Sequence, residues 1–166
     1  MMLYILRHAE AEETAESGGD EARKLTVRGK DRMSDAAAGM RAFGIKFDAI
    51  VTSPLVRAGE TAQIVAGAYS NGPPPQVLPA LSGGVPPAEA VTALAAFERH
   101  DSVLIVGHEP QLSGLVSLLL TGSPDAMHLR LRKGACVALD VPRRFERGGA
   151  ELRWMLTQRQ LRRLRK

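Results

Sequence analysis

Four side chains that can bind or attack a phosphoryl group stand at the ends of predicted strands or at the start of a predicted helix. Arg7 and His8 directly follow one apolar segment, His108 follows another, and Arg57 lies in the first turn of the helix expected after a third. Ligands of open α/β sheets bind beyond the carboxyl ends of the strands, so these segments can bring the four side chains to one place. Two helices that begin there also point free N–H groups at it. The pattern predicts a cationic pocket that attracts a phosphoryl group.

Each of these residues has an ordinary structural interpretation when it is taken alone. A histidine at a strand end is more often structural than catalytic. An arginine in the first turn of a helix is commonly a surface charge, although there it opposes the helix dipole. Chance places four such residues at one predicted edge much less often than one, and the coincidence favours a shared site.

Apolar strand-like segments alternate with helical segments along the chain. This alternation predicts an α/β fold, a three-layer sandwich with a mostly parallel central sheet flanked by helices. Strands are expected near residues 3–6, 48–52, 77–78, 102–106, 135–141 and 151–156, and helices over residues 26–43, 54–66, 89–99 and 111–120. Thr26 and Ser53 are the expected N-caps of the first two helices. The acidic segment 10–21 has no helical or strand period and is predicted to be a loop.

The composition is typical of a soluble globular protein, since 45% of the 166 residues are hydrophobic and 24% are charged. At this length we expect residues 1–166 to form one domain. A single cysteine, Cys136, excludes an intramolecular disulfide framework and fits a reducing compartment. The apolar runs are far shorter than the roughly 20 residues of a membrane-spanning helix, and the first residues do not resemble a signal peptide. We expect a cytoplasmic protein without a membrane partner.

Positive charge is concentrated at the C-terminal end of the chain. Residues 143–166 hold nine basic and two acidic residues, a net charge of +7, whereas residues 1–142 carry −3. Such an end can attract nucleic acid, a membrane surface or an acidic protein. Because no aromatic residues interleave the charges of the terminal helix, a solvated helix is the favoured interpretation, and a nucleic acid partner is not expected.

Three motifs, in order, resemble those of the histidine phosphatase superfamily, which also includes the cofactor-dependent phosphoglycerate mutases. They are LYILRHAE at residues 3–10, SPLVRAGETA at residues 53–62 and VGHEP at residues 106–110. The short chain, the Leu25-Thr26 pair with Gly29, and the ending at residues 152–154 are similar to the small bacterial phosphohistidine phosphatases. The resemblance covers residues 1–161 and implies the phosphoglycerate mutase-like fold.

The resemblance also implies a role for each residue of the predicted site. His8 would be the nucleophile that becomes phosphorylated, and Arg7, Arg57 and His108 would bind the phosphoryl oxygens. Side-chain chemistry agrees, because a neutral imidazole nitrogen is a good nucleophile and arginine offers paired donors suited to phosphate oxygens. A bound phosphate would raise the pKa of His108 and let it donate as an imidazolium. We expect no metal and no cofactor.

Two departures from the superfamily pattern bear on the chemistry. Ala9 stands where the superfamily usually has glycine, which predicts a tighter backbone beside His8. Larger members supply a carboxylic general acid between the second and third motifs, but residues 78–84 hold no carboxylate. Glu10 and Glu89 are the remaining candidates, although solvated positions are the favoured interpretation of both. The missing acid fits the phosphohistidine branch, because an alkoxide leaving group needs a positioned acid far more than an imidazole does.

We therefore expect a metal-independent phosphatase that hydrolyses phosphohistidine, or a related phosphoramidate, through phosphorylated His8. Its partner would be a phosphoprotein or a small phosphorylated substrate. A general phosphomonoesterase acting on small metabolites is one alternative, and relative rates on a phosphohistidine peptide and an aryl phosphate would distinguish it. A non-catalytic phosphoprotein-binding module is the other, and the presence of all four pocket residues argues against it.

Overall fold

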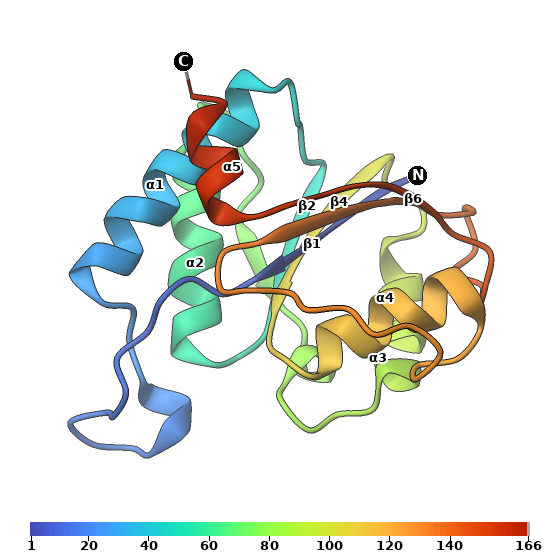
Figure 1. The fold of residues 1–166 in the computed structure, drawn as a ribbon, viewed down its shortest axis with the longest axis horizontal. Coiled ribbons are helices and arrows are strands. Elements are labelled where there is room, and N and C mark those ends of the chain that lie inside the picture. Colours follow the sequence, from blue (N-terminus) through green and yellow to red (C-terminus); the bar gives the residue numbers. More distant parts are fainter. Residues whose placement is uncertain (166) are drawn as a thin grey trace.

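Helices cover both faces of one sheet (Figure 1), and the predicted α/β fold is confirmed. The computed structural model describes residues 1–165. The strands are β1 (Met2–Arg7), β2 (Ala49–Thr52), β3 (Pro75–Val77), β4 (Ser102–Gly107), β5 (Cys136–Asp140) and β6 (Glu151–Leu156). The α-helices are α1 (Val27–Ala42), α2 (Val56–Gly67), α3 (Pro87–Leu94), α4 (Gln111–Thr121) and α5 (Gln158–Arg163). Short 3-10 turns are η1 (Asp20–Ala22), η2 (Pro79–Leu81) and η3 (Ala95–Phe97).

The strand order places the carboxyl ends of β1, β2 and β4 side by side. The order is β3-β2-β4-β1-β5-β6. The first four of these strands run parallel, whereas β5 is antiparallel to β1, and β6 is antiparallel to β5. Helices α1, α2 and α5 lie on one face and α3 and α4 on the other (Figure 1). Because β1, β2 and β4 are parallel neighbours, the residues that follow them meet at one edge.

Strand β4 shows why an apolar run forms the centre of this sheet. Val103, Leu104, Ile105 and Val106 are all fully buried. Val103 and Ile105 pack in the core beside α3 and α4, whereas Leu104 and Val106 pack in the core beside α1 and α2. Successive side chains of a strand point to opposite faces. A strand covered on both faces therefore needs apolar residues at every position.

Backbone hydrogen bonds continue past the strand ends and hold the site segments together. The His8 N–H donates to the Gly107 carbonyl at 3.1 Å, and the Ser53 N–H donates to the Val106 carbonyl at 2.9 Å. The residue after each of β1 and β2 is thereby fixed beside β4. No helix among the described residues has the length and apolar character needed to cross a membrane.

The start of α1 supports the segment behind His8. Thr26 is its N-cap, as predicted, and its Oγ1 accepts from the Gly29 N–H at 2.9 Å. The Thr26 N–H donates to the Glu10 carbonyl at 3.0 Å. A Cβ at position 29 would overlap that same carbonyl oxygen, so the close approach of α1 requires glycine there.

The predicted starts and ends of two helices were wrong. Helix α2 begins at Val56 with Leu55 at its N-cap, rather than with Ser53 as the cap. The Ser53 Oγ accepts from the Leu55 N–H at 3.3 Å, just before the helix, and also lies 2.7 Å from His108 Nε2. The third helix, expected over residues 89–99, ends at Leu94 and passes into η3.

The C-terminal helix is packed, which differs from the expected solvated end. Leu161 of α5 is fully buried against the side of the sheet that α1 covers. Arg162 forms an ion pair with Asp35 of α1 at 3.4 Å, and Arg165 pairs with the same carboxylate. Part of the positive charge is thus neutralised within the fold. Lys166, the last residue of the predicted basic end, lies outside the described residues.

Candidate active site

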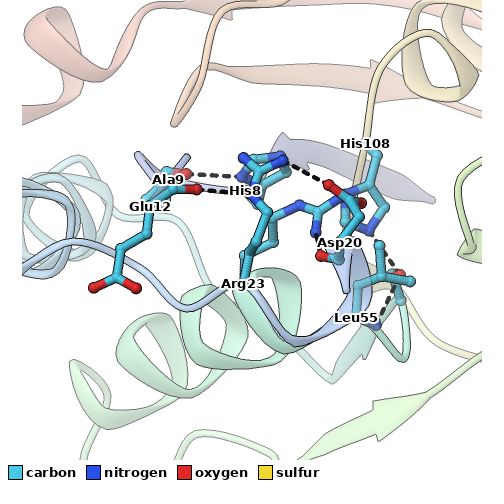
Figure 2. Close-up of polar contacts among 9 residues, drawn as sticks. His8, Ala9, Glu12, Asp20, Arg23, Leu55 and His108 are labelled. Carbon is cyan, nitrogen blue, oxygen red and sulfur yellow. Dashed lines mark hydrogen bonds and ion pairs between the residues drawn. The ribbon is translucent and has the colours of Figure 1, made fainter. Parts of the chain in front are cut away.

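The structure brings the four predicted site residues together at the carboxyl edge of the sheet. Arg7 ends β1 and His8 follows it, Arg57 lies in the first turn of α2, and His108 follows β4. The ring centroids of His8 and His108 are 5.1 Å apart (Figure 2). His8, Arg57 and His108 are buried. Ionisable groups are seldom buried together without a functional reason, so this cluster is the candidate active site.

His8 is held in the tautomer that a nucleophile requires. Its Nδ1 lies 2.7 Å from the Ala9 carbonyl oxygen. A carbonyl can only accept, so Nδ1 carries the proton and the lone pair is on Nε2. Burial, followed by the charges of His108, Arg57 and Arg7, lowers the pKa of His8 to about 3, although the bond to Ala9 opposes the shift. The imidazole is therefore neutral at physiological pH.

Ala9, the departure from the family pattern, is accommodated without strain. The side chain is fully buried in the core beside α1 and α2. No residue other than glycine in the described chain has a positive φ. The Ala9 N–H donates to Thr61 Oγ1 at 3.1 Å, and Thr61 Oγ1 donates to the Arg57 carbonyl at 2.7 Å. Ala9 thus helps to tie the segment after His8 to the first turn of α2.

His108 is also neutral in this structure. Burial is the largest cause of its lowered pKa of about 4, and Arg57 and Arg7 add to the shift while Asp20 opposes it. A neutral imidazole still offers one N–H, and a nearby phosphoryl dianion would raise the pKa toward the doubly protonated form. The hydrogen bond to Ser53 Oγ at 2.7 Å fixes the orientation of the ring.

Asp20 is a site residue that the sequence analysis missed. Arg57 donates from Nη1 to the Asp20 carbonyl at 2.7 Å and from Nη2 to Asp20 Oδ2 at 2.9 Å. Arg23 donates to the other carboxylate oxygen at 2.6 Å and, through Nε, to the Glu12 carbonyl at 2.7 Å (Figure 2). The loop contains several acidic residues. Sequence alone gives no reason to single out Asp20 among them, because the contact depends on the path of the loop.

Three buried nitrogens of the cluster have no hydrogen-bond partner within the described residues. They are Arg7 Nε, Arg57 Nε and His108 Nδ1. Buried donors without partners are costly, and an anion with several acceptor oxygens can satisfy them. The donor set therefore suits a phosphoryl group. A divalent metal does not suit it, because cationic side chains would repel the ion.

The two glutamates considered as acids do not join the cluster. Glu10 pairs with Arg28 at 3.0 Å and with Arg32 at 3.6 Å, both on α1. Glu89 lies in the first turn of α3, which packs on the opposite face of the sheet from α2. Glu109, beside His108, was not considered. One of its oxygens accepts from Ser113 Oγ and the other is buried without a partner among residues 1–165.

Comparison with known proteins identifies the family. A family model described as histidine phosphatase superfamily (branch 1) matches residues 3–82. An uncharacterised protein of Picosynechococcus sp. is 35% identical over 144 residues, which cover 84% of each chain. The chain belongs to the histidine phosphatase superfamily.

Individual relatives of this histidine phosphatase agree with the fold and the reaction class. The phosphohistidine phosphatase SixA of Escherichia coli (strain K12) is 28% identical over 159 residues, 95% of this chain and 94% of its own. A solved structure of the protein histidine phosphatase SixA with tungstate has a TM-score of 0.84 at 24% identity, covering 97% of this chain and 99% of that one. The alpha-ribazole phosphatase of Shigella flexneri has a TM-score of 0.71 at 21% identity, covering 95% and 97%. The chain is thus a phosphatase with the phosphoglycerate mutase-like fold.

Proposed function

We propose that this phosphatase hydrolyses phosphohistidine, or a related phosphoramidate, through a phosphorylated His8. One observation carries the choice of substrate. Asp20 is the carboxylate that hydrogen-bonds to an arginine of the cluster, and its bonds to Arg23 and Arg57 lower its pKa. An ionised carboxylate cannot protonate a leaving group, so the site suits substrates that need no acid from the protein. The similarity to SixA along nearly the whole chain supports the same substrate class.

The first step would transfer the phosphoryl group to His8. The Nε2 lone pair attacks phosphorus, and the P–N bond of the substrate breaks. A phosphohistidine ring that has taken a proton from solvent departs as neutral imidazole, with the bonding pair returning to its nitrogen. Arg7, Arg57 and His108 would bind the equatorial oxygens, and the Ala9 carbonyl would hold the Nδ1 proton as positive charge develops on His8.

The second step would regenerate the enzyme. Water attacks phosphorus, the P–Nε2 bond breaks and its electron pair returns to Nε2. Both protons of the water leave with the product, as dihydrogen phosphate, which exchanges protons with solvent. His8 is again neutral, as its lowered pKa requires.

Matched peptides test this substrate choice. We expect kcat/KM on a phosphohistidine peptide to exceed that on a phosphoserine peptide of the same flanking sequence by about 10²–10⁴, the usual contribution of a positioned acid. His8→Ala is the control for enzymatic turnover. Comparable rates on the two peptides would overturn the proposal.

A general phosphomonoesterase is the second candidate, and Glu109 is the observation in its favour. Glu109 directly follows His108, one of its carboxylate oxygens is buried without a partner among residues 1–165, and its charge opposes the lowering of the Arg7 pKa that burial causes. If alkyl phosphates are good substrates, Glu109→Gln should lower their rate more than the rate on an activated aryl phosphate. Phosphopeptide binding without any turnover would instead indicate the non-catalytic binding module.

A further inference from the structure

An open cleft lies beside the candidate active site and shares Arg7 with it. Its volume is about 720 Å³, and Arg7 forms part of its lining. Pockets of about 300–1,000 Å³ hold ligands far larger than a phosphoryl group. The cleft therefore has room for the part of a substrate that carries the phosphoryl group.

Charged side chains dominate the cleft. Ala11 is the one apolar residue among those that line it, and the described residues place no aromatic side chain there. Three acidic residues, Glu10, Glu12 and Glu13, come from the segment after β1, whereas Arg130, Arg132 and Lys133 come from the segment before β5 and are called the basic segment below. A ligand with charged groups can form ion pairs with these side chains, which a purely apolar ligand cannot.

The basic segment has no internal counter-ion. Arg130, Arg132 and Lys133 are exposed, and within residues 1–165 their side chains form no ion pair. Glu10, by contrast, is already paired with Arg28 and Arg32. Together with Arg7, the basic segment offers uncompensated positive charge beside the nucleophile. The exposed Glu12 and Glu13 would repel an anion. An anionic group of a ligand would therefore lie toward the basic segment rather than toward these glutamates.

The backbone of the basic segment is fastened to the catalytic strand. Arg7 Nη1 donates to the Leu131 carbonyl at 2.9 Å, and the Arg7 N–H donates to the Ala135 carbonyl at 3.1 Å. The Gly134 N–H lies 3.1 Å from the carbonyl oxygens of both Arg7 and His8. Leu131 is buried in the core. The basic segment is thus attached at a fixed place relative to His8, as a recognition site requires.

We infer that Arg130, Arg132 and Lys133 bind acidic side chains flanking the phosphorylated residue of a polypeptide substrate. The inference rests on the proposed phosphohistidine function and adds a second anionic group to the substrate. Charge complementarity carries it, because cations without an ion-pair partner in residues 1–165 line a cleft that shares Arg7 with the candidate active site. The basic C-terminal end is a weaker candidate, since Arg162 and Arg165 are paired with Asp35.

A binding experiment separates recognition from turnover. Two labelled peptides would carry a non-hydrolysable phosphohistidine analogue, one with aspartate and one with asparagine on both sides of it. Fluorescence anisotropy would give the ratio of their dissociation constants for the full chain, for Arg132→Gln/Lys133→Gln and for Arg159→Gln/Arg163→Gln. The last variant removes the same charge from exposed positions of α5.

We expect the wild type to bind the acidic peptide more tightly than the asparagine peptide. In Arg132→Gln/Lys133→Gln, the cleft variant, the ratio of the two dissociation constants should fall by about 2- to 30-fold, the effect of removing two exposed ion pairs. The α5 variant should retain the preference, and high salt should remove it. Equal affinity for both peptides, no binding of either, or the same loss in both variants would overturn the inference. Tighter binding of an unphosphorylated oligonucleotide, lost in the cleft variant, would overturn it in favour of nucleic acid. Binding of the acidic peptide without hydrolysis of its phosphohistidine counterpart would count against the proposed function alone.

Discussion

The carboxylate of Asp20 is bonded to Arg57, one of the arginines that would bind the phosphoryl group. Arg57 donates one N–H from each Nη group to Asp20, so a phosphoryl group that approaches through the two Nη groups must compete with Asp20 for them. The Asp20 side chain is 61% exposed, whereas that of Arg57 is 8% exposed. The carboxylate can therefore move into solvent while the guanidinium stays in place. We therefore expect Asp20 to compete with a bound anion for Arg57.

Asp20→Asn should bind product more tightly. Loss of the competing charge is expected to lower the inhibition constant of inorganic phosphate by about 2- to 5-fold, the size of an exposed ion pair. Inhibition of aryl phosphate hydrolysis measures this constant. Glu21→Gln, in the same turn, is the matched control and should leave it unchanged. Unchanged or weaker phosphate binding in Asp20→Asn would show that Asp20 does not compete.

The lowered histidine pKa values make a prediction about acid pH. Protonation of Nε2 destroys the nucleophile, and burial moves this event down to a pKa of about 3 in His8. The rate of enzyme phosphorylation, corrected for ionisation of the substrate, should be flat from pH ~5 to ~8 and fall only below pH ~4. Rapid-quench measurements would show this profile. A break near pH 6.5 that belongs to the enzyme would mean that His8 is not buried as described.

The same histidines link stability to pH. The unfolded chain binds protons on them near pH 6.5, whereas the folded chain does so only near the lowered values of His8 and His108. The unfolded state thus holds more protons between pH ~4 and ~6.5, and the free energy of unfolding should fall as pH falls through that window. Urea unfolding of the wild type and of His108→Asn measures the effect, which should be smaller in the variant. An equal slope in both proteins would assign the linkage to other groups.

At the level of secondary structure, the start of α1 is the support for the segment behind His8. Gly29 allows the helix to approach the Glu10 carbonyl closely, and this contact supports the segment that follows His8. Gly59, within α2, has open space where a Cβ would stand. Replacement by alanine should therefore change the stability of the protein differently at Gly29 and at Gly59.

Gly29→Ala should destabilise the protein and Gly59→Ala should not. The added methyl at position 29 forces the helix or residue 10 to move, at a cost of about 1–3 kcal/mol, and should lower kcat/KM by displacing His8. The methyl at position 59 should stabilise the helix by about 0.5–1 kcal/mol. Thermal unfolding and aryl phosphate kinetics measure both variants. Equal stability of the two would show that the approach of α1 is not tight.

Elements set by local pattern were predictable, whereas contacts that depend on loop paths were not. The apolar run of β4 predicted a central strand because a strand covered on both faces needs apolar residues at every position. The convergence of Arg7, Arg57 and His108 followed from the geometry of parallel strand ends. Ser53 was assigned to a helix cap because sequence cannot show that the helix begins two residues later or that His108 bonds to this hydroxyl. Asp20 was missed because its position depends on how the acidic loop folds back.

At the scale of the whole molecule, charge is separated into a cationic site, a mixed-charge cleft and a basic end tied to α1. Within residues 1–165, no group of three or more histidine, cysteine, aspartate or glutamate residues is placed to hold a metal ion. We expect activity to change less than about twofold after exhaustive chelation, because protein side chains supply the hydrogen bonds and positive charge that would bind the phosphoryl oxygens. Loss of activity that one specific metal restores would contradict this prediction.

The most direct test of the account is chemical trapping of the phosphorylated enzyme. The wild type would be mixed with a radiolabelled phosphohistidine peptide, quenched in alkali within milliseconds, digested and mapped. The account predicts an acid-labile phosphate on His8 that appears before free phosphate and is absent from His8→Ala, although that variant remains folded. Steady turnover without a labelled enzyme, label on another residue, or substantial activity in His8→Ala would contradict it.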